Sequence, residues 1–144
     1  MFLYLAINMK ATTKHLYIKK STLPQAGKGL FTKEFIPKGT RIVEYIGRIS
    51  SWRDADHRDG TNAYIYYVNR NHVIDAFTYK KAFARYANDA NGLIKKEGVR
   101  NNACYEKNGS GVFITATRNI EAGEEIFVGY GKEYWDVIRK NKES

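Results

Sequence analysis

The stretch EAGEEIFVGYG, residues 121–131, decides the fold of this chain, although only in combination with the segments that precede it. Taken alone, it predicts a glycine-containing turn followed by a strand. It contains Tyr130, one of eleven tyrosines among 144 residues. Tyrosine combines a rigid ring with a polar tip, so this abundance suggests buried hydroxyl groups or a cleft that they line.

A second stretch, RYANDANGL at residues 85–93, is small and polar, although apolar, strand-like segments lie on both sides of it. It brings Asn88, Asp89 and Asn91 close together in the sequence, and Gly92 follows them. Asparagine, aspartate and glycine are typical of tight turns. The residues alone leave open whether the segment is merely a turn or a loop that holds a ligand.

The rest of the chain consists mostly of short strand patterns. Strands are expected at residues 15–21, 41–49 and 111–120, and as a hairpin formed by residues 64–68 and 73–76. Helical segments are expected at residues 51–60 with Ser51 as N-cap, within residues 79–87, and at the C-terminus within residues 132–143. The sequence therefore predicts one domain of the α+β class, mostly β.

The net charge of +9 points to an acidic partner, either nucleic acid or an acidic protein surface. The lysines are scattered rather than arranged in a stripe, which also fits an ordinary basic protein. The single cysteine, Cys104, excludes an internal disulfide and a cysteine zinc cluster and fits a reducing compartment. The three histidines are far apart, so no metal site is expected. The apolar start is too short to span a membrane and lacks the features of a secretion signal.

Five segments in a fixed order carry a family resemblance: residues 27–49, 64–76, 84–92, 101–105 and 111–131. In this order they resemble the SET domain, the fold of protein-lysine methyltransferases. The resemblance implies several small curved β-sheets with a pseudoknot, formed where the segment ANDANG and the last strand thread together, and a short C-terminal helix. It divides the chain into an N-terminal extension (residues 1–13), the SET domain (residues 14–131) and a C-terminal helix that closes the substrate channel (residues 132–144).

The same resemblance implies that the chain binds S-adenosyl-L-methionine. Asn88 matches the family asparagine that contacts this cofactor, whereas Asp89 stands where the family has histidine and Ala90 where it has serine. An aspartate at this position would either accept a hydrogen bond from the adenine amino group or anchor the loop. The residues implied in cofactor binding are Lys28, Gly29, Leu30, Tyr86, Asn88, Asp89, Tyr130 and Trp135.

The implied catalytic residues are all tyrosines. Tyr130 matches the family's catalytic tyrosine, and Tyr64 and Tyr105 match tyrosines of the substrate channel. Because the family's zinc-binding cysteines are absent, Trp135 and Tyr134 are expected to close this channel. A narrow aromatic channel disfavours the lysine ammonium, whose pKa is about 10.4 in water. No strong general base is then required.

These features predict a protein-lysine N-methyltransferase that uses S-adenosylmethionine and modifies a histone or another basic protein. Two alternatives stay open: a SET-fold binding module with weak or no catalysis, suggested by Asp89 and Ala90, and a basic nucleic-acid-associated protein, suggested by the charge. The expected partner is a protein that presents a lysine, and the chain is expected to be a monomer or homodimer with no membrane association. It would act in the cytoplasm of a bacterium, or in the nucleus on chromatin if it is eukaryotic or viral.

Overall fold

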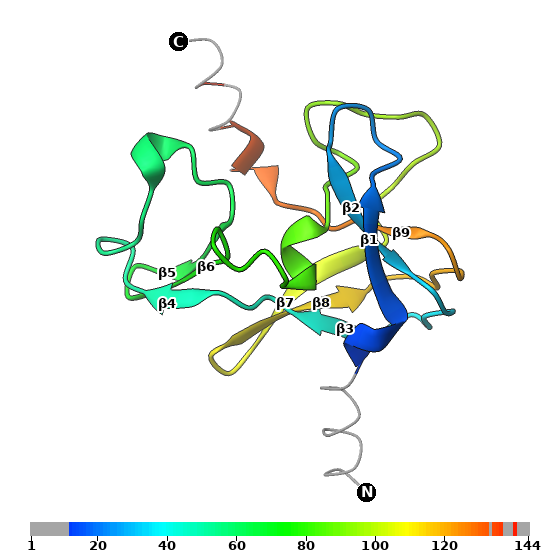
Figure 1. Ribbon diagram of the computed structural model, residues 1–144, viewed down its shortest axis with the longest axis horizontal. Helices are drawn as coiled ribbons and strands as arrows, with labels where there is room; N and C mark the ends of the chain where they lie inside the picture. The colour runs from blue at the N-terminus through cyan, green and yellow to red at the C-terminus, as the bar shows by residue number, and fades with distance from the viewer. Residues whose placement is uncertain (1–11, 133, 137–139, 141–144) are drawn as a thin grey trace, which may run out of the picture.

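Three small antiparallel sheets dominate the computed structural model of this chain, which describes residues 12–132, 134–136 and 140 (Figure 1). The first sheet has the order β1-β2-β9 and contains β1 (Leu16–Lys20), β2 (Lys28–Thr32) and β9 (Glu125–Ile126). The second has the order β3-β8-β7 and contains β3 (Arg41–Glu44), β7 (Ala103–Asn108) and β8 (Gly111–Ala116). The third has the order β4-β6-β5 and contains β4 (Arg48–Ser50), β5 (Ile65–Asn69) and β6 (His72–Asp75).

The helical segments are short. Among the described residues they are three 3-10 helices, η1 (Thr12–His15), η2 (Arg58–Gly60) and η3 (Phe83–Tyr86), together with helical backbone at Lys132, residues 134–136 and Lys140. The predicted α+β class with mostly β structure is therefore confirmed. Within the part of the chain that the structure describes, no helix has the length and apolarity needed to cross a membrane.

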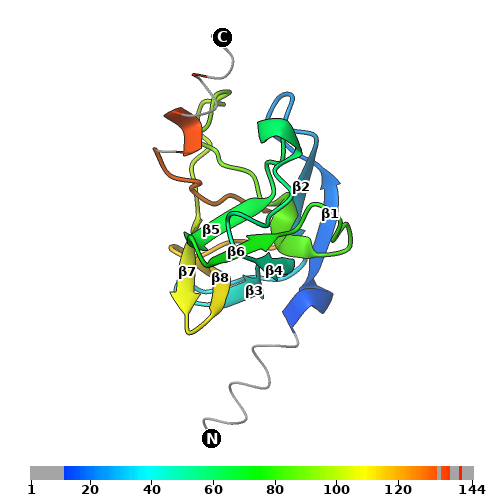
Figure 2. The ribbon, with the colours of Figure 1, turned by 90° about the vertical axis from the view of Figure 1, so that its left-hand side faces the viewer.

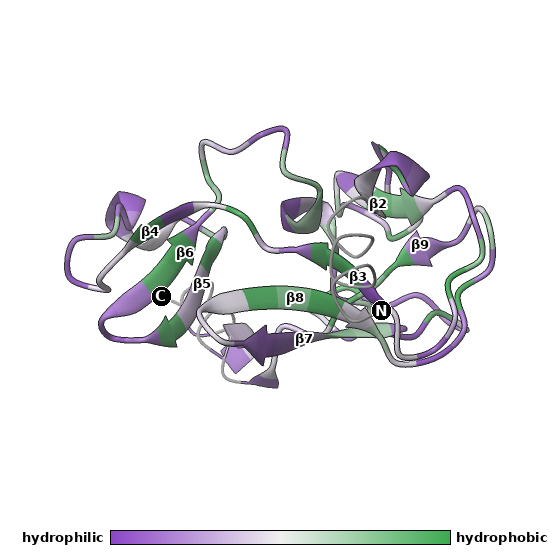
Figure 3. Cartoon of the chain, turned by 90° about the horizontal axis from the view of Figure 1, so that it is seen from below, coloured by the Kyte–Doolittle hydropathy of each residue, from purple (hydrophilic) through white to green (hydrophobic). Residues whose placement is uncertain are grey.

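The core forms where the sheets meet. The second sheet lies below and between the other two in Figure 1. In the rotated view of Figure 2, β5 and β6 of the third sheet face the viewer. Val112 and Ile114 on β8 are fully buried, and Figure 3 shows β8 as an apolar strand in the middle of the second sheet. This packing of short strands around β8 holds the connecting loops in fixed positions, and the candidate site is built from those loops.

The expected strand over residues 41–49 is wrong in one respect. The structure divides it into β3 and β4, which belong to different sheets. The division comes at Gly47, where an added Cβ would lie 2.5 Å from the backbone oxygen of Asp75. This close approach of two backbones bends the chain out of the second sheet and into the third.

The expected helix over residues 51–60 is also wrong. Ser51 Oγ does accept a hydrogen bond from the backbone N–H of Asp54 at 3.1 Å, so the capping contact exists. Arg58 and Asp59, however, have φ angles of 50° and 55°, in the left-handed region that a right-handed helix excludes. The segment is a series of turns that ends in η2. The hairpin at residues 64–76 and the helical turn within residues 79–87 are confirmed as β5–β6 and η3.

Residues 127–128, directly after β9, form a crossing segment that lies between two parts of the chain distant in sequence, as the predicted pseudoknot requires. Phe127 forms a parallel bridge with Asn88, and Val128 forms one with Ala103. The Val128 N–H donates to the Asn88 carbonyl oxygen at 2.9 Å, and the Phe127 carbonyl oxygen accepts from Ala103 at 3.0 Å. The side chain of Asn102 is almost fully buried, and its Oδ1 accepts from the Phe127 N–H at 2.8 Å. The crossing segment is thus held between the polar loop, residues 85–93, and the start of β7.

The two predicted terminal parts are only partly described. Residues 1–11 of the N-terminal extension lie outside the described residues, as do residue 133, residues 137–139 and residues 141–144 of the predicted C-terminal helix. The described C-terminal residues have the expected helical conformation and follow the crossing segment, drawn from orange to red in Figure 1.

Candidate active site

Tyr130 lies just after the crossing segment, and the polar loop fixes both its backbone and its side chain. Its N–H donates to Asp89 Oδ2 at 2.9 Å, and its hydroxyl donates to the Ala87 carbonyl oxygen at 2.5 Å. Burial raises the pKa of the Tyr130 hydroxyl, and the nearby Tyr134 raises it further, so the phenol keeps its proton. Because that proton points to Ala87, the hydroxyl presents oxygen lone pairs to any neighbouring molecule.

Four further tyrosines pack with Tyr130 into a tyrosine cluster that consists of Tyr45, Tyr66, Tyr105, Tyr130 and Tyr134. The ring centroids of Tyr105 and Tyr130 are 6.4 Å apart, and those of Tyr130 and Tyr134 are 5.0 Å apart. Tyr105 also packs against Tyr66 at 4.9 Å and Tyr45 at 6.0 Å. Burial raises the pKa of Tyr45 and Tyr105, so their hydroxyls also stay neutral. The sequence offers no signal that separates Tyr45 and Tyr66 from the other tyrosines, and neither was predicted.

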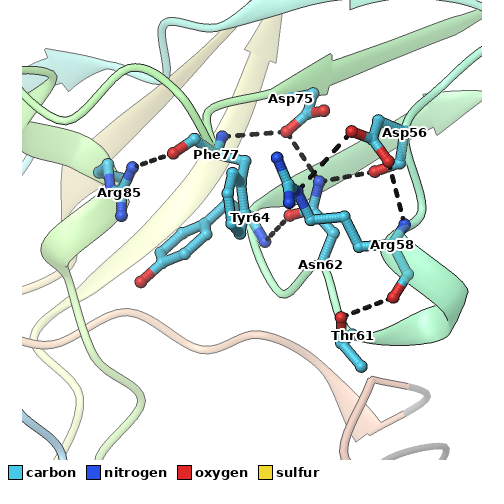
Figure 4. Close-up of polar contacts among 8 residues, drawn as sticks. All are labelled: Asp56, Arg58, Thr61, Asn62, Tyr64, Asp75, Phe77 and Arg85. Atoms are coloured by element: carbon cyan, nitrogen blue, oxygen red, sulfur yellow. Dashed lines mark hydrogen bonds and ion pairs between the residues drawn. The ribbon is translucent and has the colours of Figure 1, made fainter.

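Tyr64, just before β5, is held beside this cluster by the network in Figure 4. The guanidinium of Arg85 lies 3.9 Å from the centroid of its ring, a cation–π contact. Arg85 is anchored in turn, because its Nη1 donates to the carbonyl oxygens of Ala76 and Phe77 at 2.8 and 2.7 Å. The Tyr45 hydroxyl donates to the Tyr64 carbonyl oxygen at 2.8 Å, which links Tyr64 to the cluster.

Asn62 holds the backbone of Tyr64 from the other side of the same network. Its Oδ1 accepts from the Tyr64 N–H at 2.9 Å, and its Nδ2 donates to Asp75 Oδ1 at 3.0 Å (Figure 4). Asp75 is buried and also accepts from the Phe77 N–H at 2.9 Å. The position of Tyr64 is therefore set by β6 and the turn after it, rather than by β5 alone.

The side chain of Asn88 meets the glycine-flanked start of β2. Asn88 Nδ2 donates to the Lys28 carbonyl oxygen at 3.0 Å and to Glu125 Oε2 at 3.4 Å. Its Oδ1 accepts no hydrogen bond from any described residue, and the side chain is only half-buried. The structure thus brings the predicted residues Lys28, Gly29 and Asn88 together and leaves one amide oxygen available to a ligand.

Glu125 is the buried centre of this contact, and it was not predicted from the sequence. Its Oε2 accepts from Ser21 Oγ at 2.6 Å, and its Oε1 accepts from the N–H and hydroxyl of Thr22 at 2.8 and 2.7 Å. A Cβ on Gly29 would lie 2.3 Å from Glu125 Oε2, so the carboxylate itself requires glycine there. The sequence signal was a carboxylate in an otherwise apolar strand, which is expected only where the charge has partners.

Asp89, which stands where the resemblance predicts a histidine, is buried and accepts four hydrogen bonds. Its Oδ1 accepts from the Asn91 N–H at 2.8 Å and from Asn101 Nδ2 at 2.9 Å. Its Oδ2 accepts from the Tyr130 N–H at 2.9 Å and from the indole Nε1 of Trp135 at 2.6 Å. A carboxylate offers about four lone-pair sites, so these protein donors use its whole capacity.

Trp135 lies flat against the ring of Tyr130. The two ring centroids are 5.7 Å apart and the ring planes differ by 10°, while Tyr134 contacts the indole edge-on at 5.0 Å. The indole also packs on Gly92, where an added Cβ would lie 2.4 Å from Trp135 Cζ2. The two residues expected to close the channel therefore both contact Tyr130.

Two of the predicted cofactor residues lie away from this group. Leu30 is fully buried, and it pairs with Ile18 on one side and Ile126 on the other, so it supports the site from the core. The Tyr86 hydroxyl donates to the Lys80 carbonyl oxygen, so this hydroxyl is directed toward the loop before η3. The other predicted residues form two groups that adjoin where Asn88 and Asp89 follow each other in the chain. Lys28, Gly29 and Asn88 meet at Glu125, and Asp89, Tyr105, Tyr130 and Trp135 pack together, with Tyr64 beside them.

One cavity of the described structure combines basic and acidic side chains. A cavity of about 420 Å³ is lined by Lys19, Arg100 and Arg118, but Glu124 and Glu125 line it as well. Mixed charges of this kind give no preference for a phosphate backbone, which is bound by clustered cations.

Comparisons with known proteins agree on one family. The family model for the SET domain matches residues 27–131. The H3 lysine-4 specific histone-lysine N-methyltransferase of Schizosaccharomyces pombe is 30% identical over 135 residues, covering 85% of this chain and 13% of that protein. The histone-lysine N-methyltransferase EZH2 of Chaetomium thermophilum is 28% identical over 144 residues, covering 91% of this chain and 9% of that protein.

Among solved structures, the methyltransferase domain of human PR domain-containing protein 2 is similar with a TM-score of 0.60 and 22% identity. The similarity covers 81% of this chain and 77% of that domain. It supports the fold assigned above. The chain spans only a small part of the length of the two curated relatives.

Proposed function

This chain belongs to the SET domain family, and we propose that it transfers a methyl group from S-adenosylmethionine to the ε-amine of a lysine in a protein substrate. The observation that carries the proposal is the fixed position of Tyr130, whose hydroxyl is hydrogen-bonded to Ala87 beside the cofactor-type residue Asn88. The tyrosines packed around it are half-buried or buried, and burial raises the pKa of their hydroxyls, so they stay uncharged. Such a site suits a substrate that must be oriented rather than deprotonated by a strong base.

The residues present fit the proposed cofactor. S-adenosylmethionine supplies an electrophilic methyl group on a sulfonium, together with an ammonium and a carboxylate on its amino acid end. The free Oδ1 of Asn88 is an acceptor that suits an ammonium, and the backbone at Lys28 and Gly29 lies next to it. Trp135 and Tyr134 offer aromatic faces to an adenine or a cation. We assign these residues to cofactor binding.

The tyrosine cluster also favours the reactive form of a lysine. The burial that raises the pKa of Tyr105 and Tyr130 disfavours charge, and the same desolvation disfavours a lysine ammonium. The neutral amine would then be the form bound next to the Tyr130 oxygen. Tyr130 and Tyr64 would orient its nitrogen through their hydroxyl oxygens, and alignment of this kind is worth several kcal/mol, roughly the lower part of the proximity scale.

The substrate that we propose is a histone or another basic protein, because the named relatives are histone-lysine methyltransferases. A chromatin-associated, nuclear location belongs to the same proposal. The exposed carboxylates Asp54, Asp56 and Asp59, in the turns between β4 and β5, are the nearest source of negative charge to Tyr64 in sequence. They offer a basic peptide partners that the overall charge of +9 does not.

A radiolabel methyl-transfer assay on histones and on cell lysate tests the proposal. Tyr130→Phe removes the hydroxyl but keeps the ring, and it should lower turnover by roughly tenfold to a hundredfold while affecting cofactor binding less. Tyr67→Phe is the matched control, because Tyr67 is 53% exposed on β5. Equal labelling by the parent protein and Tyr130→Phe would remove Tyr130 from the mechanism. Cofactor binding by calorimetry without any labelling would instead favour a binding module.

A further inference from the structure

The hydrogen bonds of Asp89 join three segments that are far apart in the sequence. Asp89 itself lies in the polar loop, Tyr130 follows the crossing segment, and Trp135 belongs to the C-terminal helical segment. We propose that Asp89 is a positioning residue that latches the C-terminal segment onto the active site through Trp135. The proposal rests on the proposed function for its effect on methyl transfer, but the latch itself does not depend on catalysis.

The chemistry of the four contacts requires a carboxylate. All four partners of Asp89 are N–H donors, two at each oxygen. An asparagine could accept at only one oxygen, and its amide NH₂ would face the two donors of the other pair. A carboxylate that is filled by protein donors has no acceptor left for the cofactor. All four bonds have the same charged acceptor, and the contact at Trp135 is the shortest of them, at 2.6 Å.

The remaining contacts of Trp135 are contacts of its ring. It stacks on Tyr130, meets Tyr134 edge-on and packs against Gly92. The bond to Asp89 is therefore the polar contact that fixes the orientation of the indole. A hydrogen bond to a charged group shifts an equilibrium by about tenfold to a hundredfold, which is the change expected in the ratio of docked to undocked Trp135.

The fluorescence of Trp135 itself reports whether its indole is docked on the site. The chain has two tryptophans, so Trp52→Phe leaves Trp135 as the sole one, and Trp52 is 46% exposed and packs against His57 and Tyr67. In this background we expect Asp89→Asn to raise the acrylamide quenching of Trp135 fluorescence severalfold. Asp136→Asn is the matched control, because it changes a neighbouring carboxylate that pairs with Lys132 and should leave quenching unchanged.

Gly92→Ala gives a second, independent perturbation. Its Cβ would displace the indole by steric contact without changing any polar atom, so it should raise quenching as Asp89→Asn does. This variant keeps the proposal testable if Asp89→Asn fails to fold. Quenching that is the same in the parent, Asp89→Asn and Gly92→Ala would overturn the latch, as would an equal rise with Asp136→Asn.

Calorimetry with S-adenosylmethionine connects the latch to the site. Trp135→Phe keeps an aromatic ring but removes the donor, and it should raise the Kd of the cofactor up to about tenfold, since undocking reduces the binding-competent fraction. Asp89→Asn should do the same, and the double variant should be no worse than either single variant. Independent, multiplied effects in the double variant would overturn the coupling. If the parent protein binds no cofactor but the quenching results hold, the proposed function fails and the latch stands.

Discussion

The carboxylate of Glu125 connects the first sheet with the loop at Asn88. Its replacement should lower the stability of the fold and loosen the position of Asn88. In Glu125→Gln the donors Ser21, Thr22 and Asn88 stay in place. The new amide can keep the bonds to Thr22 through its oxygen, and its NH₂ can donate to the Ser21 hydroxyl. It loses the charge at a site that is 5% exposed, and it places NH₂ against NH₂ at Asn88.

The loss of stability in Glu125→Gln follows from the hydrogen bonds that the variant keeps and loses. One charge-assisted hydrogen bond is worth about 1.5–3 kcal/mol, so we expect Glu125→Gln to lower the free energy of unfolding by about that amount. For a domain of this length the melting temperature should fall by roughly 5–10 °C. Cofactor binding should weaken as well, since Glu125 helps to hold Asn88.

Urea unfolding monitored by circular dichroism measures this change directly, and Glu124→Gln is its matched control. Glu124 is the preceding residue, it is more exposed, and its side chain makes no hydrogen bond or ion pair with the described residues. The control should shift stability by less than about 0.5 kcal/mol. Equal unfolding curves for Glu124→Gln and Glu125→Gln would refute the view that the Glu125 carboxylate joins the first sheet to the loop at Asn88.

Alkaline pH should destabilise the fold, because burial raises the pKa of Tyr45 and Tyr105 above 10.0, their value in the unfolded chain. Above pH 10 the native state then holds more protons than the unfolded state, so the free energy of unfolding falls by about 1.4 kcal/mol per pH unit for each group. The contribution is complete below pH 10, and urea midpoints that do not change above it would contradict the assignment. Gly47→Ala should lower the melting temperature markedly in a thermal scan, because its Cβ would lie 2.5 Å from the Asp75 backbone oxygen and neither backbone segment can move without strain. An unchanged melting temperature would contradict this close approach.

Local patterns in the sequence predicted those elements whose causes are local. The β5–β6 hairpin follows from alternating residues around the turn at residues 69–71, and the helical turn at η3 from its own composition. The break between β3 and β4 could not be predicted, because its cause is the contact of Gly47 with Asp75, which is distant in the sequence. β7 was not predicted as a strand either, since its outer half is polar and its pairing with β8 determines it.

The candidate site divides in the same way. The order of motifs indicated Asn88 and Tyr130, and the structure brings both to one crossing point. Tyr45 is placed by contacts with distant segments, which leave no pattern in its own neighbourhood, whereas Glu125 left one signal, a carboxylate among apolar residues. Sequence motifs can indicate the residues expected to contact a ligand. The residues that hold those side chains in place are identified only from their contacts in the structure.

Asp89, at the position where the resemblance predicts a histidine, illustrates this point and yields a last prediction. Judged by the motif alone, Asp89 suggests a damaged cofactor site, but its four donors include the side chains of Asn101 and Trp135. A neutral histidine has one acceptor nitrogen, so it would leave three of these four part-buried donors without their partner. Asp89→His introduces the residue that the resemblance predicts, yet it should lower the free energy of unfolding by about 3 kcal/mol or more, at 1–3 kcal/mol for each of three unpaired groups. Urea unfolding measures it, and a variant as stable as the parent would mean that residue 89 acts independently of Asn101 and Trp135.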